Sequence, residues 1–78
     1  MGLFKDNITV DIDDNYLYLV IDNITYNFEL KKISQRLYNA NISDKKKFVL
    51  SPSKYGIHWF AIDEDLSISA LLKMQTDI

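Results

Sequence analysis

The residues best suited to chemistry lie between positions 55 and 65 of this 78-residue chain. The stretch holds the only histidine, His58, the only tryptophan, Trp59, and three consecutive acidic residues, Asp63, Glu64 and Asp65. A histidine and carboxylates can act as general acid and base, or hold a divalent cation, if they converge in one pocket. The composition of the stretch therefore raises the hypothesis of a metal-assisted or acid–base enzyme built on these groups.

A nucleophilic site around His58 is not supported by its surroundings. A catalytic triad requires a serine or cysteine within hydrogen-bond reach of the histidine. The chain has no cysteine, and no serine stands in a nucleophile-elbow pattern. Ile57 and Trp59 on either side of His58 are typical of a strand, so we interpret His58 as structural or as part of a binding surface.

The acidic segments have simple structural interpretations. Adjacent carboxylates such as Asp63 to Asp65, between a strand and a helix, usually face solvent and stabilise the positive end of the helix dipole. A second segment, from Asp11 to Asp22, has the outline of a calcium-binding loop, but Tyr16 replaces the required glycine and Asp22 the bidentate glutamate. We expect neither a bound metal nor a cofactor.

The basic residues do not favour nucleic acid. The only basic cluster is Lys45 to Lys47, and the chain has a net charge of −2 and a pI near 5.1, the wrong sign for a protein that neutralises phosphates. We interpret the three lysines as a solvated turn. A nucleic-acid-binding surface of these lysines with Lys54 and Tyr55 remains an alternative hypothesis.

Hydrophobic periodicity predicts the elements that position these groups. Alternating or continuous apolar residues predict strands over 7–12, 16–21, 24–28, 48–50 and 57–62. Asp13 to Asn15 and Asp22-Asn23 are typical of hairpin turns, the second of type I′. Ser34 is placed to cap a helix over 34–40, Ser43 to cap one further turn, and Ser67 or Asp65 to cap a short C-terminal helix.

These elements predict a single α+β domain over residues 1–78, with the order βββαββα in two layers and with all strands in one sheet. An open sheet leaves two unpaired edges, so a homodimer is possible. The chain has no membrane-length apolar run and no signal-peptide pattern at its start, so we expect a cytoplasmic protein without membrane partners. The apolar stripe between Leu66 and Met74 favours a role in the core, although docking on another chain stays open.

Several segments resemble one family of small bacterial proteins. They are Gly56-Ile57-His58-Trp59, Asp63-Glu64-Asp65-Leu66-Ser67, Leu71-Leu72, Arg36-Leu37, Asn39-Ala40 and Ser43. In these segments the chain resembles domain of unknown function twenty-four forty-two, over about residues 8–72. It departs from that family at Phe60, where a proline usually follows the tryptophan, and at Ser69-Ala70. The resemblance implies a strand meander, a helix and two further strands, no established enzymatic activity, and members that often look like the antitoxin half of a two-gene toxin–antitoxin module.

The sequence thus predicts a non-enzymatic protein-binding module, an antitoxin-like partner of a toxin-like or other basic protein. Aromatic anchors beside acidic residues are enriched at binding hot spots and steer basic partners. The predicted partner-binding residues are Tyr55, His58, Trp59, Asp63, Glu64 and Asp65. A small acidic inhibitor of a nuclease or defence protein is an alternative that uses the same surface.

Overall fold

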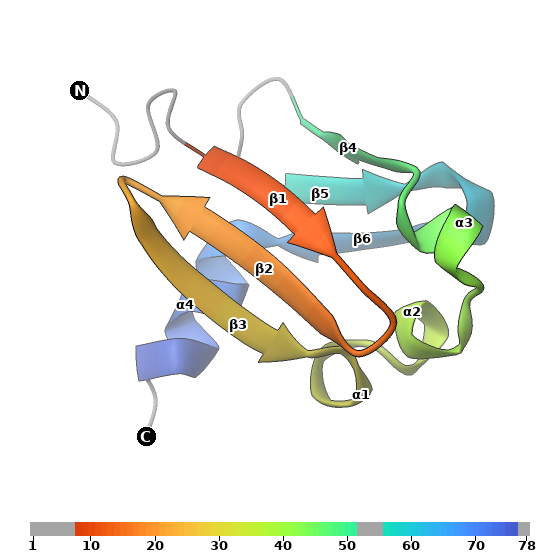
Figure 1. The fold of residues 1–78 in the computed structure, drawn as a ribbon, viewed down its shortest axis with the longest axis horizontal. Coiled ribbons are helices and arrows are strands. Elements are labelled where there is room, and N and C mark those ends of the chain that lie inside the picture. Colours follow the sequence, from red (N-terminus) through yellow and green to blue (C-terminus); the bar gives the residue numbers. More distant parts are fainter. Residues whose placement is uncertain (1–7, 52–55, 77–78) are drawn as a thin grey trace.

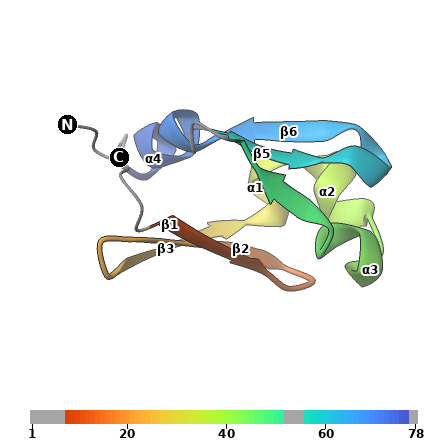
Figure 2. The ribbon, with the colours of Figure 1, turned by 90° about the horizontal axis from the view of Figure 1, so that it is seen from above.

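The computed structural model describes residues 8–51 and 56–76, which form two three-stranded antiparallel sheets in two layers (Figure 1, Figure 2). The first sheet has the order β1-β2-β3, with β1 at Ile8–Ile12, β2 at Tyr16–Ile21 and β3 at Ile24–Glu29. The second has the order β4-β5-β6, with β4 at Phe48–Leu50, β5 at Gly56–Trp59 and β6 at Glu64–Ser67. The predicted α+β class is confirmed, but the strands form two sheets and not one.

The first sheet is a meander whose turns follow from side-chain chemistry. Asp13 accepts hydrogen bonds from the backbone N–H groups of Asn15 and Tyr16 at 2.9 and 2.7 Å, which closes the turn between β1 and β2. Asp22 and Asn23 both have positive φ, 51° and 70°, as a two-residue type I′ turn requires. The predicted turns and the central position of β2 are therefore confirmed.

Three short helices carry the chain from one layer to the other, at one end of the molecule (Figure 2). They are α1 at Leu30–Ile33, α2 at Gln35–Asn39 and α3 at Ile42–Lys45. The Ser34 hydroxyl accepts from the N–H of Leu37 at 3.1 Å, which confirms the predicted cap of α2. The cap of α3 is Asn41 and not Ser43, since the Asn41 side chain accepts from the N–H of Asp44 at 2.8 Å. After α3 the chain enters β4, the first strand of the second sheet.

The C-terminal part differs from the prediction at one turn. The fifth strand ends at Trp59, and a 3-10 turn, η1 at Phe60–Ile62, follows. Asp63 is in the left-handed conformation, so the chain reverses and Glu64–Ser67 pairs with β5 as an additional strand. The terminal helix α4, at Ile68–Thr76, therefore begins after Ser67, whose hydroxyl accepts from the N–H of Ala70 at 3.2 Å. The prediction that Asp63 to Asp65 lie at a helix N-terminus is wrong.

The core lies between the two layers, and α4 continues the second layer beyond β6 (Figure 2). Its buried apolar residues come from both sheets and from α1, α2 and α4; they are Ile8, Ile12, Leu17, Leu19, Ile21, Phe28, Leu30, Leu37, Ile57, Trp59, Ile68 and Leu71. Ile24 shares the inward face of β3, as predicted, but is 55% exposed at the end of its strand. Ile68 and Leu71 confirm a core role for the stripe of α4. Within the described residues, no helix has both the length and the apolar character needed to cross a membrane.

Candidate partner-binding surface

The β5–β6 hairpin places a histidine opposite an aspartate on the outer face of the second sheet. Ile57 and Trp59 are buried against the first sheet, so the alternation of a strand turns His58 outward. His58 pairs with Asp65 in the register, and its Nδ1 lies 3.6 Å from Oδ2 of Asp65. The His58 side chain is 32% exposed and that of Asp65 78% exposed. The Asp65 carboxylate therefore leaves most of its surface available to a partner.

The turn beside this pair is anchored to helix α2. Asp63 has a φ of 54°, and its backbone N–H donates to the carbonyl of Phe60 at 3.3 Å. The Arg36 guanidinium, from α2, donates through Nη1 to the carbonyl of Asp63 at 2.8 Å. The turn is thus held in place at its tip by a charge-assisted hydrogen bond.

Phe60 is the most exposed large apolar side chain among those described, at 70%. Its ring centroid lies 4.1 Å from that of His58, with the rings in an edge-to-face arrangement. Val49, which faces His58 across the β4–β5 ladder, is 49% exposed. We call these residues and the two aspartates the outer patch; it consists of Val49, His58, Phe60, Asp63 and Asp65.

Phe60 was not among the partner-binding residues predicted from the sequence. The available signal was the alternation of the strand, because a buried Trp59 requires the next side chain to point the other way. The family resemblance drew attention to the position only as a departure from the usual proline. An exposed aromatic ring at that departure is what the structure adds.

Trp59 does not belong to the exposed surface for which it was predicted. It is fully buried, and its indole Nε1 donates to the backbone carbonyl of Lys45 at 2.8 Å. Its ring is 6.3 Å from that of Phe48 on β4. A side chain of this size with its one donor satisfied contributes to the core and cannot touch a partner directly.

The three acidic residues do not act as one cluster. Glu64 lies on the inner face opposite Trp59, and its carboxylate accepts hydrogen bonds from the hydroxyl of Ser34 and from the N–H of Asp65. Glu64 therefore fastens β6 to the N-cap of α2, while Asp63 and Asp65 remain on the exposed side. Tyr55, the remaining predicted contact, lies outside the described residues.

A hollow of about 380 Å³ lies next to the His58–Asp65 pair on the same outer face. It is lined by Ser51, Gly56, Ile57, His58, Asp65, Leu66 and Ser67. Gly56 begins the central strand β5 and adds no side chain to this face. The hollow and the outer patch share His58 and Asp65, so they form one continuous surface.

The prediction of a solvated turn is wrong for Lys45 but holds for Lys46 and Lys47, which are exposed. Lys45 is 2% exposed, and its Nζ donates to the carbonyl of Asp14 at 2.9 Å. Lys46 pairs with Asp11 at 3.4 Å and Lys47 with Asp44 at 4.0 Å. The three lysines thus point to separate carboxyl or carbonyl groups of this chain and do not form one basic surface.

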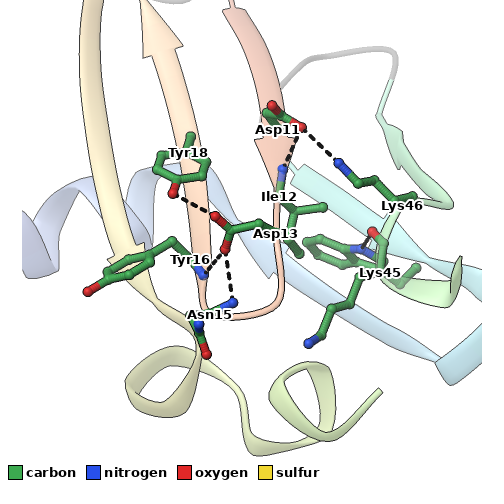
Figure 3. Close-up of polar contacts among 9 residues, drawn as sticks. Asp11, Ile12, Asp13, Asn15, Tyr16, Tyr18, Lys45 and Lys46 are labelled. Atoms are coloured by element: carbon green, nitrogen blue, oxygen red, sulfur yellow. Dashed lines mark hydrogen bonds and ion pairs between the residues drawn. The ribbon is translucent and has the colours of Figure 1, made fainter. Parts of the chain in front are cut away.

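A second polar cluster lies at the β1–β2 turn (Figure 3). The N–H of Asn15, the hydroxyl of Tyr18 and the N–H of Tyr16 all donate to the Asp13 carboxylate and hold its pKa below the usual value. The hydrogen bond from the Tyr18 hydroxyl to Asp13 also raises the pKa of Tyr18. These donors occupy the carboxylate, so the cluster stabilises the turn.

Metal ligation has no support in the geometry. In residues 8–51 and 56–76, no three His, Cys, Asp or Glu side chains are grouped so that they could hold a metal ion. His58 and Asp65 are a pair, and Glu64 is turned to the other face of the sheet. This part of the chain therefore offers no ligand set from which to derive a metal-dependent reaction.

Together these features define a small α+β domain of two antiparallel sheets, with an aromatic and acidic patch on the second sheet. A family model described as Protein of unknown function (DUF2442) matches residues 7–76. The chain belongs to this family, which confirms the resemblance found in the sequence. Searches among curated proteins and among solved structures gave no match.

Proposed function

We propose that this chain is a non-enzymatic protein-binding module that binds a basic protein through the outer patch, as the antitoxin-like partner in a two-gene toxin–antitoxin type of system in the cytoplasm. One observation carries the proposal: Phe60 is 70% exposed on an anchored turn, contacts the His58 ring, and belongs to the hairpin that carries the exposed residues Asp63 and Asp65. Phe60 and the half-exposed Val49 both leave apolar area on this face, and an exposed apolar patch with polar residues around it is typical of a protein–protein interaction site.

The patch has the composition of a binding hot spot. Phe60 and Val49, both in line with His58, supply its apolar area, and aromatic anchors contribute a large share of the affinity at protein interfaces. Asp63 and Asp65 supply negative charge at the rim, which accelerates encounter with a basic partner. Arg36 lies beside Asp63 but donates to its backbone carbonyl, so its guanidinium is engaged at the turn.

Inhibition of a nuclease or defence protein fits the same surface, because such proteins expose basic grooves to bind phosphates. The two hypotheses differ only in the activity of the partner. Expression of the partner alone and together with this chain distinguishes them, since an antitoxin restores growth of the host and an inhibitor lowers a measured activity.

The test is co-purification of the tagged chain expressed with its genomic neighbours, followed by mass spectrometry and sizing of the complex. We expect a stoichiometric basic partner that is lost on Phe60→Ala and weakened on Asp65→Asn. Ile24→Ala is the matched control, because Ile24 is also an exposed apolar side chain but lies on the first sheet. A partner retained by Phe60→Ala and Asp65→Asn, or no partner, would contradict the proposal.

A further inference from the structure

The hollow next to the outer patch is lined in part by Gly56, at a position that does not require glycine. Gly56 does not have a positive φ, so its backbone conformation is open to other residues. A Cβ built on Gly56 would meet the carbonyl of Leu66 at 3.7 Å and the hydroxyl of Ser51 at 3.9 Å, which are ordinary contacts. Among the described residues, neither conformation nor space explains the missing side chain.

The glycine also weakens the strand in which it stands. Gly56 is bonded on one side to Ser51, through two hydrogen bonds of 3.2 and 2.9 Å, and is paired on the other with Ser67. Glycine loses more backbone entropy than alanine when it is fixed in this way. A glycine in a strand often marks a place where another group approaches the backbone closely.

The groups around the hollow indicate the chemistry of that approaching group. The Asp65 carboxylate, 78% exposed, lines the hollow beside the His58 imidazole, and that imidazole in turn contacts the ring of Phe60, which lies outside the hollow. Ser51 and Ser67 also line the hollow, and their hydroxyl groups accept hydrogen bonds from the N–H groups of Gly56 and Ala70. A carboxylate next to aromatic rings attracts a cation that is flat enough to stack and that can donate more than one hydrogen bond.

Resting on the proposed function, we infer that the hollow over Gly56 receives an arginine side chain of the protein partner. The guanidinium donates to Asp65 and lies against the His58 ring, while its stem covers the backbone of β5 where Gly56 has no side chain. Arginine fits this site better than lysine, because its planar fork pairs with a carboxylate and stacks on aromatic faces. The backbone surface that Gly56 leaves uncovered thus becomes part of the interface.

The test uses the full ¹⁵N-labelled chain and a blocked arginine amide, with blocked citrulline and blocked lysine amides as probes of charge and shape. In an NMR titration we expect saturable shifts at the amides of Gly56, His58, Asp65 and Ser67. The uncharged citrulline derivative should bind more weakly, by up to about fivefold, the loss of one exposed ion pair. Lysine should also bind more weakly than arginine.

Two variants fill the hollow in steps. Gly56→Ala adds a Cβ for which the described residues leave room, and Gly56→Val adds the volume that excludes a guanidinium stem. We expect arginine binding to weaken in Gly56→Ala and to disappear in Gly56→Val, with unchanged spectra elsewhere in the chain. Thr25→Val, on an exposed position of β3, is the control and should bind arginine like the unchanged chain.

Equal binding of citrulline or lysine, shifts confined to other parts of the chain, or undiminished binding by Gly56→Val would overturn the inference. Complex formation with the natural partner, measured for Phe60→Ala and Gly56→Val, distinguishes failure of the arginine site from failure of the proposed function. If Phe60→Ala abolishes the complex and Gly56→Val leaves it intact, the binding surface stands and the arginine site does not. If neither variant affects the complex, the surface itself is wrong.

Discussion

Asp13 and Asp65 both lie in antiparallel hairpins, yet the structure uses their carboxylates in opposite ways. Asp13, in the first sheet, receives two backbone N–H groups and one tyrosine hydroxyl (Figure 3). Asp65, in the second sheet, faces a half-buried histidine at 3.6 Å and keeps 78% of its side chain exposed. The first carboxylate is occupied by its own turn and the second is available.

The difference shows that acidic residues in a sequence acquire a role from the donors around them. A turn of the β1–β2 kind presents several N–H groups to one side chain, whereas a residue in the middle of a paired strand has its backbone donors committed to the ladder. The free carboxylate is therefore found where the backbone is already satisfied. Four experiments test this contrast between an occupied and an available surface.

The largest effect should separate two neighbours, Trp59 and Phe60. Trp59→Ala removes a fully buried ring and its hydrogen bond to Lys45 and should lower the free energy of unfolding by about 3–5 kcal/mol. Phe60→Ala removes a 70% exposed ring and should change it by less than about 0.5 kcal/mol. Urea denaturation measures both values.

Because Trp59→Ala could unfold so small a domain, Trp59→Phe provides a second measurement, with a smaller loss in the same direction. Phe60→Ala should retain the fold and lose the partner. A large loss of stability in Phe60→Ala would show that this ring supports the fold and would remove the main argument for the outer patch.

The next effect compares the two carboxylates directly. Asp13→Ala leaves the N–H groups of Asn15 and Tyr16 to solvent and should cost about 0.5–1 kcal/mol, a modest value because the turn is exposed. Asp65→Ala should leave the free energy of unfolding nearly unchanged. Thermal denaturation of both variants at neutral pH measures the contrast, and equal losses would contradict it.

The pH dependence of stability should carry the signature of Asp13. Its folded-state pKa lies below its usual value, so its contribution is fully present above the unfolded pKa of about 3.9 and is lost as pH falls toward the folded pKa. The stability difference between the unchanged chain and Asp13→Asn should therefore shrink below about pH 4. Denaturation curves measured from neutral to acidic pH check the sign, and a difference that grows on acidification would refute the assignment.

The smallest effect should come from Tyr18→Phe. The N–H of Asn15 is the main cause of the lowered pKa of Asp13, and the Tyr18 hydroxyl is the second. Removal of the hydroxyl should raise the pKa of Asp13 only part of the way to its usual value. Carboxyl ¹³C titration of both chains measures the shift, and a pKa of Asp13 that is unchanged would show that the hydroxyl has no share in it.

Much of the first sheet could be predicted because its signals are local. The alternation of Ile8, Val10 and Ile12, the turn at Asp22-Asn23 and the Ser34 cap each depend on a few neighbouring residues. The second sheet was harder, because β6 depends on the left-handed conformation of Asp63, which the sequence does not specify. Without knowledge of that reversal, the sequence of Glu64–Ser67 is equally compatible with the start of a helix and with a strand.

The candidate site was predicted in part for the same reason. His58 and Asp65 follow from the hairpin once β6 is known, and Trp59 was taken for a surface anchor because its burial depends on the distant first sheet. Phe60 and the hollow at Gly56 were not predicted. The exposure of Phe60 depends on where β5 ends, and the hollow depends on the absence of a side chain at Gly56. Local periodicity describes what a strand contains and says little about the space left beside it.

Lys45 offers a last consequence. The two sheets share no strand, but Lys45 holds both: its carbonyl accepts from Trp59 of the second sheet, and its Nζ donates to Asp14 at the turn of the first. Lys45 thus connects the two layers by hydrogen bonds, at the end of the molecule where α3 lies. Loosening either layer should loosen the other, so the hydrogens of the Trp59 indole and of the first-sheet amides should exchange with solvent in one concerted opening and not layer by layer.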